Sequence, residues 1–275
     1  MRIDAHQHFW LLADRGDAWP PPELAAIYHD FLPDDLIPRL TQSGIDGTVL
    51  VQTLPSEDDT TFMLGLAARY AFIQAVVGWV DLKAVDASER IQALAMHPKL
   101  KGLRPMLQDI PDDDWIADPA LAPAIETMQR HNLSFDALVT PRHLSSLMVF
   151  ANRFPDMPIV IDHAAKPPIA TGDITLWKQN ITRLAAHPHI HCKLSGLVTE
   201  AALQWQVTDL RPVVDHVLEA FGADRVMWGS DWPVVDLAAD YGCWVKTTDL
   251  LLAGLDDVDR KQVLGLNAKR FYRID

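Results

Sequence analysis

Two histidines near the start of the chain, His6 and His8, are the first residues whose types and spacing could support chemistry. Side chains alternate between the two faces of a β-strand, so these imidazoles would point one way while Ala5 and Gln7 point the other. Two imidazoles on one face at the end of a strand could bind a divalent metal ion or stabilise an oxyanion. They could equally be interior histidines with satisfied hydrogen bonds, and the pattern alone does not decide.

A second group of ionisable residues follows the apolar segment Ile159–Ile161. This β-branched segment is typical of a parallel strand that is buried on both faces. Asp162, His163 and Lys166 come directly after it, and because burying them without partners would be costly, we expect them at the mouth of a barrel. If the strand continued through Asp162 and His163, their side chains would face opposite ways, and we expect His163 to face the interior.

The third candidate is Asp231, which follows the apolar segment 225–228 in the sequence Gly-Ser-Asp-Trp-Pro. Pro233 cannot donate a hydrogen bond to a neighbouring strand, so the strand should end near Asp231. A carboxylate there could bind a metal ion and take a proton from a water that attacks a carbonyl group. It could equally be the N-cap of the next helix.

These candidates need a scaffold that brings strand ends together. Eight apolar segments alternate with segments of helical spacing, and 275 residues suffice for eight strand–helix units. We therefore predict an α/β fold, a (β/α)8 barrel that forms one domain over residues 1–275. An open doubly wound sheet is the alternative, but Phe9 and Trp10 stand where that fold has a glycine-rich turn. The predicted strands are 2–8, 47–52, 72–79, 102–106, 134–139, 159–162, 190–194 and 225–228, and the predicted helices are 33–43, 60–70, 87–96, 120–131, 142–154, 174–186 and 210–221.

Long segments after strand ends are predicted to shape a binding site. Residues 11–33 are rich in proline, residues 109–119 are rich in aspartate, and residues 198–209 follow the seventh strand. Barrel enzymes build their sites from loops at this end of the strands. We expect these loops to set the substrate specificity.

Taken together, His6 and His8 on the first strand, His163 on the sixth and Asp231 on the last resemble the amidohydrolase superfamily. Five phrases in order, at 4–10, 78–82, 101–105, 162–167 and 192–197, resemble its branch of sugar-lactone hydrolases, which includes L-fuconolactonase and L-rhamnono-lactonase. The resemblance covers essentially the whole chain. It implies an enzyme that hydrolyses a small sugar-derived lactone to its aldonic acid.

The resemblance also implies a ligand set of His6, His8, His163 and Asp231, with Asp231 activating the water and the histidines polarising the carbonyl. Many superfamily members hold two metal ions with a further histidine on the fifth strand, where this chain has Asp136. The expected site therefore holds at most one divalent ion, zinc being the first choice. Because the branch is mixed in metal dependence, a metal-independent enzyme is equally compatible with the resemblance.

Six further residues near predicted strand ends are expected to bind the substrate. Arg104 could hold a lactone carbonyl or sugar hydroxyls, or it could form an ion pair with Asp136 or a loop carboxylate. Lys193 could bind a carboxylate or a lactone oxygen, or it could be a solvated rim residue. Aromatic rings stack on sugars but also pack in cores. The remaining candidates are Gln52, Trp10, Trp79 and Trp232.

Composition restricts the partners. The net charge of -13 disfavours nucleic acid, which needs a basic surface. The two cysteines, Cys192 and Cys243, make no disulfide framework, and the first residues lack the apolar stretch of a signal peptide. We expect a cytoplasmic enzyme with a small-molecule substrate and no membrane partner; its oligomeric state and its particular lactone stay open. A decarboxylase of small aromatic acids is the alternative enzyme, and a barrel without activity is the alternative outside catalysis.

Overall fold

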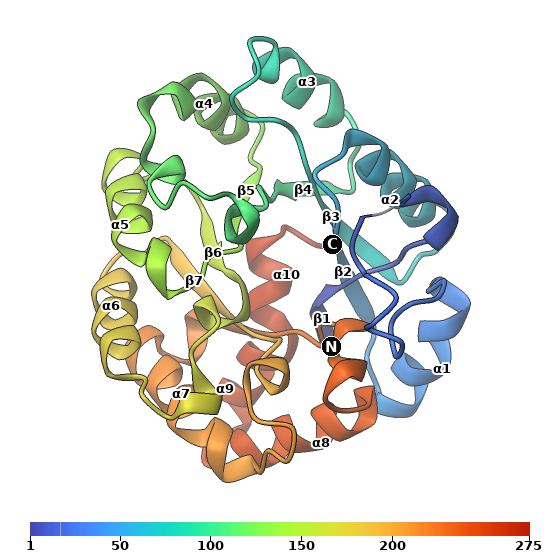
Figure 1. Ribbon diagram of the computed structural model, residues 1–275, viewed down its shortest axis with the longest axis vertical. Coiled ribbons are helices and arrows are strands. Elements are labelled where there is room, and N and C mark those ends of the chain that lie inside the picture. The colour runs from blue at the N-terminus through green and yellow to red at the C-terminus, as the bar shows by residue number, and fades with distance from the viewer. Residues whose placement is uncertain (17) are drawn as a thin grey trace.

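The computed structural model describes residues 1–16 and 18–275. At its centre is a sheet of eight parallel strands in which neighbours in sequence are neighbours in space, and helices surround it (Figure 1). This arrangement confirms the predicted (β/α)8 barrel. The strands are β1 Ile3–Gln7, β2 Gly47–Val51, β3 Ile73–Gly78, β4 Leu100–Leu103, β5 Ser134–Ala137, β6 Ile159–Ile161, β7 Ile190–Leu194 and β8 Val226–Trp228.

The ring closes between the first and the last strand, just beyond their ends. The amide of Asp231 donates to the carbonyl of His6 at 2.7 Å, and the amide of His8 donates to the carbonyl of Trp232 at 2.8 Å. Backbone pairing therefore fixes the two candidate histidines of β1 directly beside the candidate carboxylate after β8.

β1 contains an irregularity that changes which way its side chains point. The pairing with β2 shifts between Asp4 and Gln7. Before the shift, Ile3 and Ala5 pack in the apolar cluster inside the barrel, whereas Asp4 accepts a hydrogen bond from Tyr241 of α8 (Tyr241–Leu251). After it, His6 faces the interior as well. The expectation that Ala5 lies on the face opposite to His6 is therefore wrong, because a β-bulge breaks the alternation.

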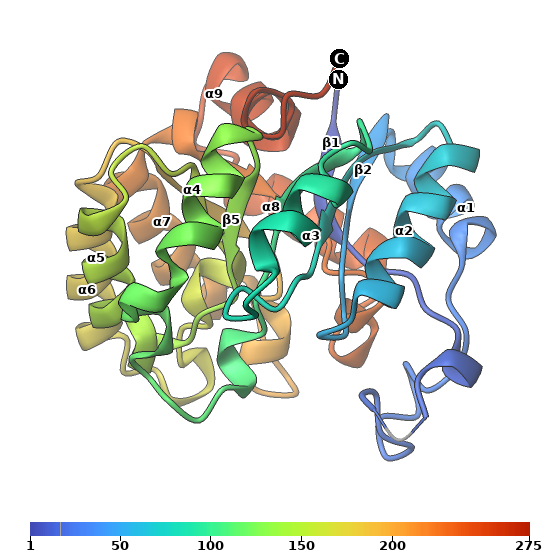
Figure 2. The same cartoon turned by 90° about the horizontal axis from the view of Figure 1, so that it is seen from above.

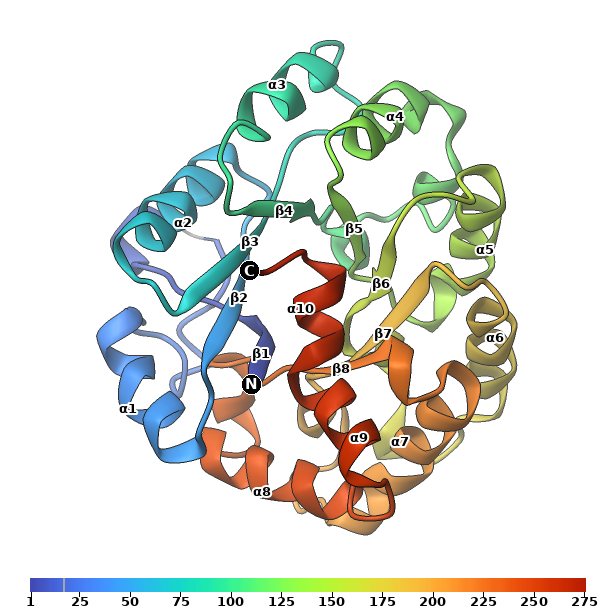
Figure 3. The same ribbon diagram turned by 180° about the vertical axis from the view of Figure 1, so that it is seen from behind.

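The helices pack on the outer face of the sheet and bury their apolar sides against it (Figures 1 and 3). Seven of them correspond to the predicted segments, and α8, α9 and α10 were not predicted. Besides α8, the helices are α1 Pro33–Ser43, α2 Glu57–Arg69, α3 Ala87–Leu94, α4 Ala122–Arg130, α5 Leu144–Arg153, α6 Thr175–Ala185, α7 Val207–Phe221, α9 Asp257–Lys261 and α10 Asn267–Phe271. In the described part of the chain, none of them is both long and apolar enough to cross a membrane.

The two ends of the barrel differ. α10 lies across the end at which the strands begin (Figure 3), and its last residue Phe271 and the following Tyr272 join the apolar cluster inside the barrel. Both termini lie on this side, and the long first loop extends from the opposite side (Figure 2). The open end is therefore the one at which the strands finish, where the candidate residues lie.

Candidate active site

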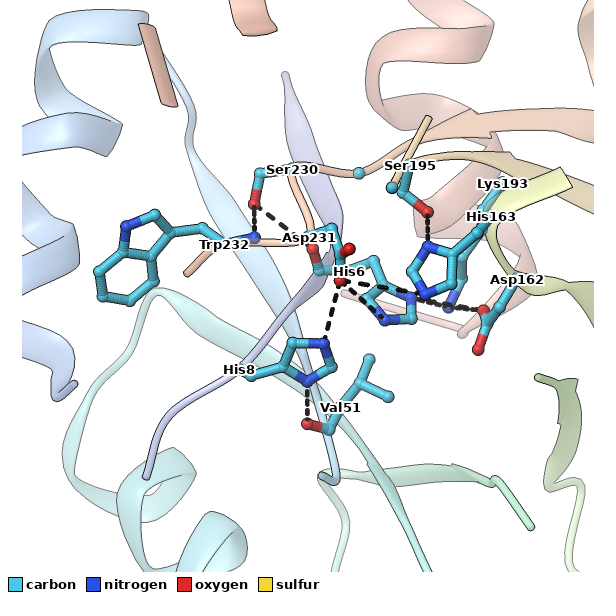
Figure 4. Close-up of polar contacts among 12 residues, drawn as sticks. His6, His8, Val51, Asp162, His163, Lys193, Ser195, Ser230, Asp231 and Trp232 are labelled. Carbon is cyan, nitrogen blue, oxygen red and sulfur yellow. Dashed lines mark hydrogen bonds and ion pairs between the residues drawn. The ribbon is translucent and has the colours of Figure 1, made fainter. Parts of the chain in front are cut away.

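Four predicted residues meet where the strands end (Figure 4). The Nε2 atoms of His8, His6 and His163 lie 3.2, 3.8 and 3.9 Å from the same carboxylate oxygen, Oδ1 of Asp231. All four side chains are buried. The structure thus gathers residues from β1, β6 and β8 around a single carboxylate.

A left-handed turn after β6 aims His163 at this centre. His163, Ala164, Ala165 and Lys166 have φ values of 53°, 50°, 62° and 50°. Residues with a Cβ rarely adopt this region, and a run of four costs energy that the surroundings must offset. Part of that compensation is visible in the indole of Trp177, which donates to the carbonyl of Ala164 at 2.7 Å.

The same turn overturns the expectation that only one of Asp162 and His163 faces the interior. β6 ends at Ile161, so strand alternation does not apply to the residues after it. Asp162 is completely buried and lies 3.3 Å from Nδ1 of His6. Both side chains therefore point toward the centre, as Figure 4 shows.

A network of buried charges lies below the histidines. Lys193 is fully buried, and its ammonium is 2.8 Å from Asp136 and 2.9 Å from Asp162. Arg104 lies 3.3 Å from Asp162. The ion pair of Arg104 is therefore with Asp162 and not with Asp136. Lys193 is neither a rim residue nor exposed to a ligand, because two carboxylates enclose its ammonium.

Hydrogen bonds to the histidine rings restrict their protonation states. Nδ1 of His8 lies 2.7 Å from the carbonyl oxygen of Val51, which can only accept, so this nitrogen carries a proton. Nε2 of the same ring faces Asp231 at 3.2 Å. The hydrogen bond to Val51 thus orients the ring so that Nε2 is directed at the carboxylate.

The ionisation states in the centre follow from burial. Burial lowers the pKa of His6 well below its usual value and lowers the pKa of His163 to about 4, so both rings are neutral at pH 7. Burial alone would raise the pKa of Asp231, but the attraction of His163 and a hydrogen bond from His8 outweigh it and hold that pKa well below its usual range. The carboxylate is therefore ionised.

This donor set fits one divalent cation. His6, His163 and Asp231 each offer a ligand atom, and these atoms lie within 4.8 Å of one another. Two neutral imidazoles and a carboxylate are ligands that zinc commonly takes. The ring of His163 is also oriented by a hydrogen bond of its other nitrogen, as is usual for histidine ligands of metals, since Nδ1 lies 2.9 Å from the hydroxyl of Ser195. One guanidinium nitrogen of Arg104 lies 3.3 Å from Nε2 of His6. Arg104 and a bound cation would therefore compete for the lone pair of this nitrogen.

A cavity of about 400 Å³ opens above the centre, large enough for a small ligand. Of the predicted residues it exposes Arg104, His8, His163 and Asp231 to a ligand. The rest of its lining comes from the loops after the strands. Those residues are Trp19, Thr53, Met106, Gln108, Asp109, Leu138, Lys166, Thr199, Glu200, Val234 and Leu237.

Five of the predicted substrate-binding residues do not line this cavity: Lys193, described above, with Gln52, Trp10, Trp79 and Trp232. The amide of Gln52 donates to the carbonyl of Arg104 at 2.7 Å, and the guanidinium donates back to the carbonyl of Gln52. Gln52 thus holds Arg104 in place. Trp10 and Trp232 are buried against Phe31. The backbone amide of Trp79 donates to the hydroxyl of Thr60 at 2.8 Å.

Sequence reasoning missed several residues that do line the cavity, notably Trp19, Glu200 and Met106. They lie in or beside the loops that were expected to set specificity, but a loop has no periodicity from which single contacts can be predicted. The sequence places Lys166 in the ionisable group after β6 but does not predict that it lines the site. Its spacing of three residues from His163 is the pattern that could have predicted this.

Comparisons with known proteins identify the family of this chain. The model of the family described as Amidohydrolase matches residues 3–274. The chain is 54% identical over its whole length to an L-fucono-1,5-lactonase of Burkholderia ambifaria, of which it covers 96%. It is 39% identical to an L-fucono-1,5-lactonase of Burkholderia multivorans, over 88% of this chain and 85% of that protein. A crystal structure of an amidohydrolase from Burkholderia multivorans with bound zinc superposes over the full length of both chains, with a TM-score of 0.93 and 37% identity.

Proposed function

The chain belongs to the amidohydrolase family and is a lactone-hydrolysing enzyme of its sugar-lactone branch, and we propose that it opens L-fucono-1,5-lactone or a close sugar lactone at Asp231. One observation carries the assignment of the site. Three imidazole nitrogens converge within 3.9 Å of one buried, ionised carboxylate oxygen at the floor of a ligand-sized cavity. A carboxylate in this position can accept the proton of an attacking water.

The chain's own residues account for each step. Asp231 takes a proton from the water while the hydroxide adds to the lactone carbonyl. Arg104, which lines the cavity, stabilises the oxyanion that forms. When the tetrahedral intermediate collapses, the bond from the carbonyl carbon to the ring oxygen breaks, and Asp231 returns the proton to that oxygen. The sum is the addition of one water and the release of an aldonic acid.

Because Asp231 is ionised, it is ready to accept a proton as the water attacks the carbonyl. Arg104 complements this base, since a stabilised oxyanion lowers the barrier of the step. Gln52 and Asp162 contribute indirectly by holding the guanidinium.

A single zinc ion is the cofactor that we propose, held by His6, His163 and Asp231 with His8 as the neighbouring fourth candidate. When bound, such an ion polarises a carbonyl and lowers the pKa of a bound water. The zinc-bound relative supports this choice. The acidic net charge of -13 supports the further proposal of a cytoplasmic enzyme that does not bind nucleic acid.

The test is hydrolysis of L-fucono-1,5-lactone, followed by acid release with a pH indicator. We expect Asp231→Asn to lower kcat by about a hundred- to ten-thousandfold, the usual contribution of a general base. Asp215→Asn is the matched control, because Asp215 is an exposed carboxylate of α7 whose partner is Arg211. Turnover by Asp231→Asn near that of the unaltered enzyme would exclude the assigned base.

A further inference from the structure

We propose that Lys166 and Glu200 form a clamp for sugar hydroxyls and select polyhydroxylated lactones; the inference rests on the proposed function. Both residues line the cavity that also exposes His163 and Asp231. They come from different loops, Lys166 from the turn after β6 and Glu200 from the segment after β7. Neither takes part in the chemistry assigned above.

The backbone of Lys166 is held in the left-handed region, with a φ of 50°. It ends the left-handed run that begins with His163, and its amide donates to the carbonyl of His163 at 2.8 Å. One strained turn therefore brings the side chains of His163 and Lys166 to the same cavity. Strain of this kind persists where the surroundings enforce it and is concentrated at functional sites.

The two head groups are paired but retain bonding capacity. Nζ of Lys166 lies 3.7 Å from Oε1 of Glu200, beyond an ordinary hydrogen bond. Each side chain keeps 27% of its surface exposed. An ammonium has three donors and a carboxylate about four acceptor positions, so one hydroxyl can accept from Lys166 and donate to Glu200.

The environment of the pair favours a strong interaction with such a hydroxyl. The carboxylate of Glu200 is partly desolvated. Burial therefore raises the pKa of Glu200, and the attraction of Lys166 opposes that shift. Hydrogen bonds to charged groups are worth more than those between neutral groups, and more so away from water. The apolar lining formed by Met106, Leu138 and Leu237 offers nothing to a hydroxyl but can contact the C–H surface of a sugar ring.

A site that hydrogen-bonds a substrate hydroxyl rejects an analogue that lacks it, because the polar groups of the site are then left unpaired. The test compares kcat/KM for L-fucono-1,5-lactone with kcat/KM for its monodeoxy analogues, each lacking one ring hydroxyl. With the unaltered enzyme we expect at least one analogue to be poorer by about ten- to a hundredfold, the usual cost of leaving a polar group unpaired. In Lys166→Met and Glu200→Gln, the hydroxylated lactone should lose a similar factor and the penalty for that analogue should shrink.

Arg211→Met and Asp215→Asn are matched controls, since they disrupt an exposed ion pair of α7 that does not line the cavity. Equal losses on all lactones, or no loss, would overturn the clamp. Calorimetric binding of L-fuconate provides a readout without turnover: the clamp variants should weaken it about tenfold or more, and unchanged binding contradicts the proposal. If the enzyme does not hydrolyse the lactone but L-fuconate binding still weakens in the clamp variants, the proposed function is refuted and the clamp proposal stands.

Discussion

Lys193 shows how one residue can matter to a site without touching a ligand. Its ammonium is enclosed by Asp136 and Asp162, and it lies 3.2 Å from Nδ1 of His6. Asp162 in turn contacts the guanidinium of Arg104. Lys193 thus balances the charge of Asp162, the carboxylate that contacts both His6 and the arginine proposed to bind the oxyanion.

Replacing this cation should destabilise the fold. Lys193→Met leaves two buried carboxylates without their partner, and removing one member of a buried ion pair typically costs about 3–5 kcal/mol. The free energy of unfolding from urea denaturation measures the effect. Lys83→Met, at a half-exposed pair, should cost at most about 1 kcal/mol. Equal effects of the two substitutions would show that Lys193 is not an essential counter-charge.

The sequence predicted His6 and His8 from their spacing on one strand, and His163 and Asp231 because each follows an apolar segment that ends abruptly. It did not predict that Asp162 would join them, since a left-handed turn among non-glycine residues leaves no mark in the composition. Nor did it assign Lys193 to the interior, because periodicity gives the face of a strand but not the depth of a side chain in the barrel. Long-range pairing decides both.

At the scale of elements, α10 acts as the floor of the barrel. The hydroxyl of Tyr272, just after α10, donates to Asp136 at 2.5 Å, so the last turn of the chain reaches the same buried network from below. The sequence predicted seven helices and all eight strands, with ends that differ by a few residues. It left out the final helices because α9 and α10 have only five residues each and no long amphipathic pattern.

Removing the hydroxyl of Tyr272 tests this floor. Tyr272→Phe keeps the ring but deprives a buried carboxylate of one donor, which should cost about 1–3 kcal/mol of unfolding free energy. The conservative change leaves packing against Phe271 intact, so the loss reports the hydrogen bond. Urea denaturation with an unchanged midpoint would mean that Lys193 and Ser134 satisfy Asp136 without this hydroxyl.

The contact between β7 and α10 should make stability depend on pH. Burial lowers the pKa of His191 from 6.5 to about 4, and its ring packs 4.7 Å from the ring of Phe271. Between these two values the unfolded chain binds the proton more tightly, so stability falls as the pH drops from about 6.5 to about 4 and is retained above that window. His191→Gln should flatten this part of the profile by roughly 1–3 kcal/mol. A profile identical to that of the unaltered protein would contradict the assignment.

At the scale of the whole molecule, the protein is acidic, yet two cationic side chains line its site. The net charge is -13, while Arg104 and Lys166 face the cavity. The field of the whole chain therefore repels an anionic product as it leaves, and the neutral lactone enters without that penalty. Binding of the lactone must depend on local contacts and not on long-range attraction.

The same charge distribution bears on metal stoichiometry. Three donors converge at Asp231, whereas the position of Asp136 is already neutralised by Lys193. We expect zinc to bind with a stoichiometry of one and to raise the Tm, because a ligand specific for the folded state adds about 2.7 kcal/mol at a hundred times its Kd. Calorimetric titration and thermal unfolding with zinc, and with magnesium as the control for general binding to an acidic protein, measure both quantities. His163→Asn should abolish the zinc-dependent rise in Tm. Binding of two zinc ions per chain would contradict the role given to Lys193, since the second ion would then occupy the position beside Asp136 that we assign to the ammonium of Lys193.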